Sequence, residues 1–148
     1  MTQAKEGHTG TVADVVADYD AICRVLQLCT EGEAKGDVAK LREAFHADAR
    51  MFGSIAGTRY DIPIEELFEL AESEPADTGT YRSRILSVHQ TGDGAVALVA
   101  EEGYWESLSF IDYFQLARTT GTGRSSASCS STPAGSPPRG SKSASHRL

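Results

Sequence analysis

The order of two periodicities along the chain is the feature that most constrains its fold. Apolar residues recur at helical spacing in the first half, whereas three later segments alternate, namely Tyr81–Thr91, Ala95–Tyr104 and Leu108–Ala117. Short turns such as Gly92-Asp93-Gly94 join them, so neighbouring strands run antiparallel. Helices followed by antiparallel strands predict an α+β domain, with N-terminal helices packed on one face of a curved antiparallel sheet.

Three helices and two short strands are predicted before these strands. The first helix covers Val12 to Lys35, and its apolar positions are Val15, Tyr19, Ile22, Leu26 and Cys29. Gly36 ends it, and Asp37 is a good N-cap for a second, short helix. Pro63 suits the first turn of a third helix. The strand candidates between the second and third helices are Arg50–Ile55 and Thr58–Asp61.

Composition excludes several classes of protein. The chain has 148 residues and a formal net charge of −7, so nucleic acid and anionic lipid are poor generic partners. No segment approaches the ~20 apolar residues of a membrane span, and the N-terminus lacks the apolar core of a secretory signal. We therefore expect a cytoplasmic protein with no nucleic-acid or membrane partner. The absence of Asn, with Arg outnumbering Lys, suggests a bacterial gene of high GC content.

The last thirty residues differ from the rest. All 21 Asp and Glu residues lie in 1–118, whereas 119–148 is rich in Ser, Gly and Pro and is basic. Such a segment buries too little apolar area to offset its ordering entropy. We therefore expect a flexible N-terminus over 1–11, a folded domain over 12–118 and a disordered tail over 119–148.

The tail also suggests a frameshift. Reading its codons in a shifted frame allows an Asp-Gly turn followed by a Trp-containing segment that alternates like a strand, the expected hairpin partner of Leu108–Ala117. Our hypothesis is that the tail is an out-of-frame read and that the final strand of the sheet is missing. Sequencing the gene across the codons of Arg118 and Thr119 tests it.

Known cofactor and metal motifs are not present. Cys23, Cys29 and Cys129 do not form a disulfide framework and are best explained as small core residues. The sequence has no CxxC, HExxH, GxSxG or Walker-type motif. We expect no cofactor and no metal.

Asp112 is the leading catalytic candidate. It alternates with Phe110 and Phe114, so the three side chains share one face of a strand. On a pocket-lining face, desolvation would raise the pKa of the carboxyl group and make it a usable general base or acid. The alternative is a structural carboxylate, paired with an Arg or capping backbone amides.

His46 is a second catalytic candidate because it directly follows the second helix. A histidine in the pocket could shuttle a proton near neutral pH. Alternatively, it binds a backbone carbonyl at the helix end or pairs with Asp48. Two such residues one position apart do not make a metal site.

Aromatic residues supply the candidate ligand-binding positions. They are Tyr19, Phe52, Trp105, Phe110, Tyr113 and Phe114. Each has a simpler explanation as core or interface, because aromatic side chains dominate both.

Several segments carry a family resemblance. Tyr19-Asp20-Ala21-Ile22, Gly36-Asp37, the run from Ala44 to Ala49, Phe52-Gly53 and the run from Phe110 to Phe114 resemble the putative lumazine-binding branch of the nuclear transport factor 2-like superfamily. This branch is close to SnoaL-like proteins and to the ketosteroid isomerase fold. The resemblance implies a cone-shaped half-barrel with a pocket between helices and sheet, and a homodimer formed through the sheet. The chain departs from the family pattern at Thr119.

The resemblance leaves two functions open. One is a pocket protein that binds a small cyclic or aromatic molecule without chemistry. The other is a cofactor-free isomerase, cyclase or dehydratase acting by proton transfer on a carbonyl compound, with Asp112 as base or acid and His46 assisting. A second polar group that converges on Asp112 would favour catalysis, and an apolar pocket with one carboxylate would favour binding.

Overall fold

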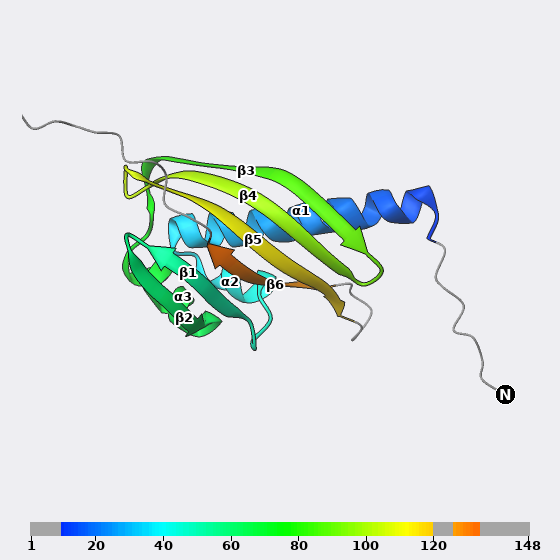
Figure 1. Cartoon of the computed structure of the whole chain (residues 1–148), viewed down its shortest axis with the longest axis horizontal. Coiled ribbons are helices and arrows are strands. Elements are labelled where there is room, and N and C mark those ends of the chain that lie inside the picture. Colours follow the sequence, from blue (N-terminus) through cyan, green and yellow to red (C-terminus); the bar gives the residue numbers. More distant parts are fainter. Residues whose placement is uncertain (1–9, 120–125, 134–148) are drawn as a thin grey trace, which may run out of the picture.

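The computed structural model describes residues 10–119 with their side chains and 126–133 through their backbone. Three helices and six strands follow one another within these ranges (Figure 1). In chain order they are α1 (Val12–Lys35), α2 (Val38–Ala44), β1 (Arg50–Ile55), β2 (Thr58–Pro63), α3 (Ile64–Ser73), β3 (Asp77–Thr91), β4 (Gly94–Tyr104), β5 (Leu108–Thr119) and β6 (Ser126–Pro133). The α+β prediction is confirmed.

Local capping explains where the first two helices begin and end. At the start of α1, the Thr11 side chain accepts a hydrogen bond from the Asp14 backbone N–H, and the Asp14 side chain accepts from the Thr11 backbone in return. Gly36 ends the helix in the left-handed region, with φ of 67°. A side chain there would lie 2.6 Å from the Ala71 carbonyl oxygen. Asp37 caps α2 as predicted, accepting from the Lys40 backbone N–H.

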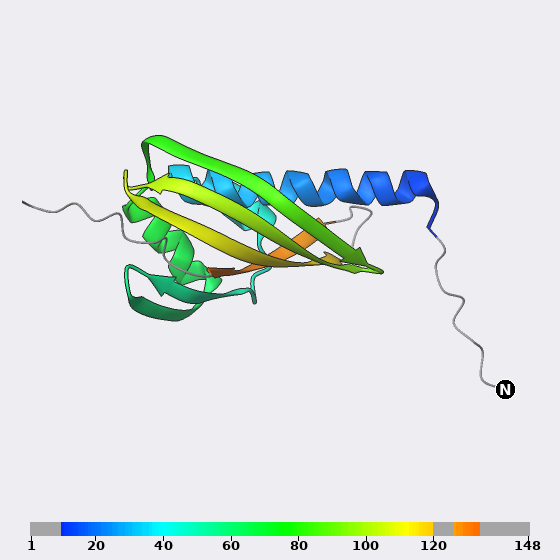
Figure 2. The ribbon, with the colours of Figure 1, turned by 45° about the horizontal axis from the view of Figure 1, so that its top comes forward.

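The sheet has four antiparallel strands in the order β3-β4-β5-β6, and β1 and β2 form a separate hairpin. Figure 2 shows α1 running along one face of the curved sheet, with α3 and the β1–β2 hairpin near the end of α1. The strand β3 begins at Asp77, earlier than the expected Tyr81. Helices thus cover one face of the sheet, the arrangement that the order of periodicities predicts.

The final strand differs from expectation. We expected the sheet to lack it and the folded region to end at residue 118, but β6 pairs antiparallel with β5 from Thr119↔Ser126 to Asp112↔Pro133. The backbone of a Ser-rich segment therefore occupies the strand position. The remainder of the expected tail lies outside the described residues, and the out-of-frame origin of the segment stays a prediction.

A single large core lies between the helices and the sheet. Its fully buried side chains include Leu26 and Cys29 of α1, Leu41 of α2, Ile64 of α3 and Phe114 of β5. The prediction that Cys29 fills the core is confirmed.

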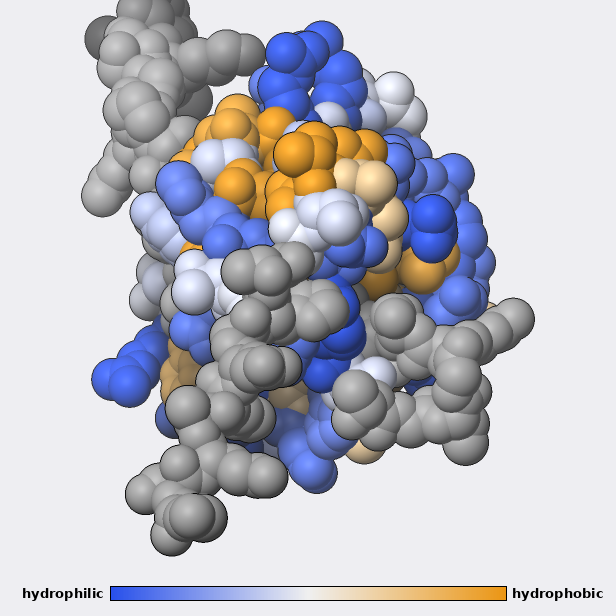
Figure 3. Space-filling model, turned by 90° about the vertical axis from the view of Figure 1, so that its right-hand side faces the viewer, coloured by the Kyte–Doolittle hydropathy of each residue, from blue (hydrophilic) through white to orange (hydrophobic). Residues whose placement is uncertain are grey.

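The first half of α1 is the exception. Val15 and Tyr19 are exposed by 56% and 49%, although their spacing predicts core positions. The start of α1 extends past the end of the sheet (Figures 1 and 2). Figure 3 looks onto this end of the molecule and shows hydrophobic residues gathered among hydrophilic ones. Among the described residues, no helix combines the length and apolar character needed to cross a membrane.

Candidate functional site

Strand pairing places two acidic side chains next to each other on the helix-covered face of the sheet. On β4, Ala97, Val99 and Glu101 point inward. Val99 is opposite Asp112 of β5, so Glu101 is a diagonal neighbour of Asp112 on the same face. Glu101 is 1% exposed and Asp112 5%. Two carboxyl groups are thus buried side by side.

A β-bulge brings a tyrosine to the same face. The register of β4 against β5 shifts between Glu102 and Tyr104, at Gly103. Gly103 has φ of 81°, and a Cβ there would lie 2.2 Å from the Thr80 carbonyl oxygen, so only glycine fits. The extra residue turns Tyr104 inward, where strict alternation would have turned it outward.

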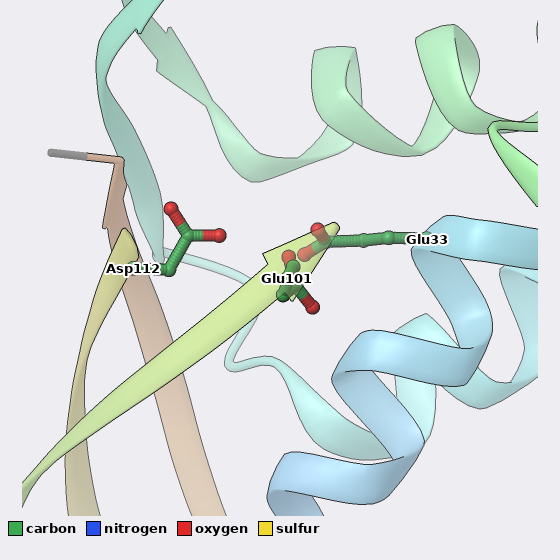
Figure 4. Close-up of side chains that lie close together, drawn as sticks. All are labelled: Glu33, Glu101 and Asp112. Atoms are coloured by element: carbon green, nitrogen blue, oxygen red, sulfur yellow. The ribbon is translucent and has the colours of Figure 1, made fainter. Parts of the chain in front are cut away.

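A third carboxyl group comes from α1. Glu33 lies seven residues after Leu26 and therefore on the buried face of the helix. One oxygen each from Glu33, Glu101 and Asp112 lies within 4.8 Å of the others, a spacing at which the three could hold a metal ion. Figure 4 shows Glu33 reaching from the helix toward Glu101, with Asp112 on the neighbouring strand. We call these three residues the carboxyl cluster.

Two tyrosines supply the cluster with hydrogen-bond donors. The Tyr81 hydroxyl donates to Glu101 Oε1 over 2.9 Å and lies 3.2 Å from the Thr30 carbonyl oxygen. The Tyr104 hydroxyl donates to Glu101 Oε2 over 2.8 Å and lies 3.3 Å from Glu33 Oε2. Glu101 is therefore held by one donor on each oxygen.

Burial raises the pKa of every carboxyl group in the cluster. Desolvation is the main cause for Asp112, whose pKa rises to about 8, and the charge of Glu101 adds to it. Desolvation also raises the pKa of Glu101, against the lowering effect of its tyrosine donors. The pKa of Glu33 is raised well above its usual range by burial and by the two neighbouring carboxylates. Protons are therefore retained in the cluster near neutral pH.

Two carboxyl oxygens in the cluster are buried without a hydrogen-bond partner. They are Glu33 Oε1 and Asp112 Oδ1. Both residues also line a small cavity. Buried polar atoms normally have partners, so an orphaned pair beside a cavity marks a place where a ligand could supply the missing donors.

The cavity has a volume of about 50 Å³. Its other walls come from β1, α3, the α3–β3 connection, the end of β4 and the start of β5. They are formed by Met51, Ile55, Leu67, Leu70, Ala71, Glu74, Ala76, Tyr104, Trp105 and Phe110. We call this cavity, with the carboxyl cluster, the cluster pocket.

Trp105 is held at the pocket wall by an unusual turn. Trp105 and Glu106 both have positive φ, 44° and 71°, and the Ser107 backbone N–H donates to the Tyr104 carbonyl oxygen. Positive φ is uncommon for residues other than glycine, and bulky residues rarely adopt it. The indole Nε1 donates to the Glu74 carbonyl oxygen over 3.2 Å. The turn thereby ties the β4–β5 connection to the end of α3.

A larger cavity of about 470 Å³ lies between the first half of α1 and the β3–β4 turn. Its charged residues include Asp18, which forms an ion pair with Arg118 and accepts a hydrogen bond from Gln90 over 2.7 Å. Asp18, Gln90 and Arg118 are thus paired with one another. We place the candidate site in the smaller cavity, because that is where buried acidic groups lack partners.

The structure brings three of the predicted site residues together. Asp112, Trp105 and Phe110 all line the cluster pocket. Phe114 shares one face of β5 with Asp112 and Phe110, as predicted, but it is fully buried in the core and contacts Phe45, with ring centroids 6.5 Å apart.

The other predicted site residues lie on the surface, away from the pocket. The His46 side chain is 52% exposed, and its Nδ1 accepts a hydrogen bond from the Asp48 backbone N–H, the structural alternative considered for it. Tyr19 is exposed on α1, and Tyr113 is exposed on the outer face of the sheet. Phe52 is 43% exposed beneath the Arg50 guanidinium.

Sequence reasoning missed Glu33, Glu101, Tyr81 and Tyr104. For the two glutamates a signal was available, because Glu101 alternates with Val99 and Ala97 and Glu33 continues the buried stripe of α1. For Tyr104 there was none, since its direction depends on the bulge at Gly103.

Residues 17–124 match the model of the family described as putative lumazine-binding. The chain belongs to this family. A comparison with curated protein sequences finds no match.

Solved structures show the same fold as this member of the putative lumazine-binding family. An NTF2-like (nuclear transport factor 2-like) protein of unknown function from Shewanella baltica is 24% identical with a TM-score of 0.72, covering 88% of this chain and 100% of its own. One from Methylobacillus flagellatus is 26% identical with a TM-score of 0.68, covering 86% and 97%. A putative ketosteroid isomerase from Shewanella frigidimarina is 13% identical with a TM-score of 0.56, covering 77% and 94%. The α+β cone fold of the superfamily is thereby established.

Proposed function

We propose that the cluster pocket binds a small cyclic molecule and that Asp112 exchanges a proton with it. The observation that carries this proposal is the Asp112 carboxyl group itself. It is 5% exposed, its pKa is raised to about 8, and its Oδ1 has no partner beside the cavity. A general acid or base works best when its pKa lies near the operating pH.

The neighbours of Asp112 support a catalytic role over simple binding. Glu101 and Glu33 converge on Asp112 within 4.8 Å, which is the second polar group that the sequence analysis required for catalysis. The Tyr81 and Tyr104 hydroxyls hold Glu101 in place. One carboxyl group can therefore give or take a proton while another keeps it oriented.

The family and its neighbours support the class of reaction. The family description names lumazine, a bicyclic ring compound, and one protein of the same fold is titled a putative ketosteroid isomerase. Moving a proton next to a ring carbonyl needs an acid or base and no cofactor. Such chemistry suits a pocket whose polar groups are carboxyls and tyrosines.

Deuterium exchange into cyclopentanone tests the proposal. Exchange at the carbon beside the carbonyl is followed by proton NMR in D₂O. We expect the wild-type chain to accelerate it and Asp112→Asn to lose about 100-fold of that acceleration, the lower range for one general acid–base group. Asp48→Asn, which changes a 93% exposed side chain, is the control. Equal rates for wild type and Asp112→Asn would contradict the proposal.

Binding without chemistry is the second candidate, favoured by the apolar and aromatic walls around the carboxyl cluster. Trp105 is the single tryptophan of the chain, so its fluorescence reports on the pocket. Lumazine that changes this emission equally in wild type and Asp112→Asn, without any exchange activity, would favour the binding function.

The homodimer expected from the family resemblance is proposed for the outer face of the sheet. Leu86, Val96 and Tyr113 are 49%, 43% and 44% exposed there, and exposed apolar groups of this kind favour association. Light scattering should give twice the chain mass for wild type and the monomer mass for Tyr113→Glu. A monomeric wild-type chain would contradict it. The cytoplasmic location stays a prediction.

A further inference from the structure

The carboxyl cluster has more acceptors than donors. Its two tyrosine donors both bind Glu101. Among residues 10–119, no Lys, Arg or His forms an ion pair with any of the three acids. Glu33 Oε1 and Asp112 Oδ1 are left buried and unpartnered beside the cavity. A group that brings several N–H donors and a positive charge would complement both the missing donors and the uncompensated acidity.

The walls of the cavity favour an organic cation over a metal ion. Tyr104, Trp105 and Phe110 line it, and aromatic faces attract organic cations. A volume of about 50 Å³ has room for a few waters, which need ~10–15 Å³ of such space each. Mg²⁺ usually keeps several waters, and Ca²⁺ takes six to eight oxygen ligands. The aromatic and apolar walls add few of the oxygen ligands that these ions need.

We infer that the cluster pocket recognises a small organic cation with planar N–H donors, of the amidinium or guanidinium type, held by Asp112 and Glu33 against the aromatic wall. This inference rests on the proposed pocket being the ligand site, and it names the chemical class of the ligand. The fork of two N–H groups on such a cation matches carboxylate oxygens in the way that arginine does.

Proton release accompanies binding. Burial raises the pKa of Asp112 and Glu33, so the free pocket holds protons that an arriving cation displaces. The titratable groups that face Asp112 or line the pocket are Glu33 and Cys29 from α1, Glu74 after α3, Tyr81 from β3, and Glu101 and Tyr104 from β4. All are acids, so affinity for a cation rises with pH up to about 8.

Amidinium ions and their neutral amides are matched probes. The full chain is titrated at pH 8 with acetamidinium against acetamide and with benzamidinium against benzamide, with Trp105 fluorescence and calorimetry as readouts. We expect at least one cation to bind tenfold or more tightly than its amide and to release about one proton. Affinity for that cation should be several-fold lower at pH 6.

Two variants and a control separate the pocket from general charge effects. Asp112→Asn and Glu33→Gln should each reduce the preference for the cation at least fivefold. Glu69→Gln, which removes an equal charge from the exposed face of α3, should leave it unchanged. Circular dichroism shows whether each variant folds. The two test variants lie on different elements, so if one fails to fold, the other still tests the inference.

Three outcomes would overturn the inference. The first is equal binding of each cation and its amide, or no binding of either cation. The second is a preference that Glu69→Gln abolishes as strongly as Asp112→Asn. The third is Mn²⁺ binding that Asp112→Asn abolishes, when the wild-type chain binds neither amidinium ion. Cyclopentanone exchange that persists in any of these cases would leave the proposed function standing, so the two failures are distinguishable.

Discussion

The inner face of the sheet divides into two regions built from the same strands. Around Phe114 it is apolar, because Ala97 and Val99 of β4 pack in one core with Leu41 and Phe45 from the helical side. The same face also carries Glu101, four residues after Ala97 on β4, and Asp112, two residues before Phe114 on β5. The first region belongs to the large core, whereas Tyr104 and Phe110 form a small cluster of their own.

The comparison shows how one fold separates stability from chemistry. The apolar region removes large side chains from water, which is the dominant stabilising contribution in folding. The acidic region buries three carboxyl groups, two of them with an unpartnered oxygen, which is costly. A domain tolerates this cost only when the rest of its core contributes enough stability to offset it.

The largest expected effect is in the apolar region. Phe114→Ala should lower the free energy of unfolding by about 3–5 kcal/mol, because it opens a cavity at a fully buried position. Urea denaturation followed by circular dichroism measures it. Phe52→Ala, at a 43% exposed position, is the control with the same change in side chain. If Phe114→Ala lowers the free energy of unfolding no more than Phe52→Ala does, the distinction between the two regions is wrong.

A smaller effect, with a pH dependence, is expected in the acidic region. The pKa of Asp112 is about 8 in the folded chain, against an ordinary value of 3.8. The native state therefore binds more protons between pH 4 and 8, and stability that is full below pH 4 is lost as pH rises toward 8.

From pH 5 to pH 8, wild type should lose at least about 1.4 kcal/mol of unfolding free energy relative to Asp112→Asn, the equivalent of one pKa unit. Urea titrations at several pH values measure the difference, which isolates Asp112 from Glu33 and Glu101. Parallel pH profiles for the two chains would show that Asp112 is not desolvated.

The smallest effect is expected at His46. Because its side chain is 52% exposed and lies away from the cluster pocket, His46→Gln should change stability by less than about 0.5 kcal/mol. Cyclopentanone exchange should be unaffected as well. A large loss of exchange would restore His46 as an assisting residue and place the chemistry outside the acidic region.

The sequence predicted most of the fold because its signals are local. The end of α1 follows from Gly36, and the start of α2 follows from Asp37. The last strand was not predicted, because β6 contains no large apolar residue from which alternation could be recognised.

The site was predicted only in part, for a different reason. Asp112 was found because it alternates with phenylalanines on one strand. Its partners come from α1, β3 and β4, and their convergence depends on strand register and on the bulge at Gly103. For His46, proximity to a helix end does not determine which side of the domain the side chain faces, so its place on the surface could not be predicted.

The turn at Trp105 and Glu106 has a consequence for how the protein can be improved. Asn-Gly suits a turn with two positive φ values, whereas this chain keeps a tryptophan and a glutamate there, at a conformational cost of roughly 1–3 kcal/mol each. Replacing them is the obvious route to a more stable variant. That route also removes a wall of the pocket, so at this turn selection for stability and selection for ligand recognition act in opposite directions.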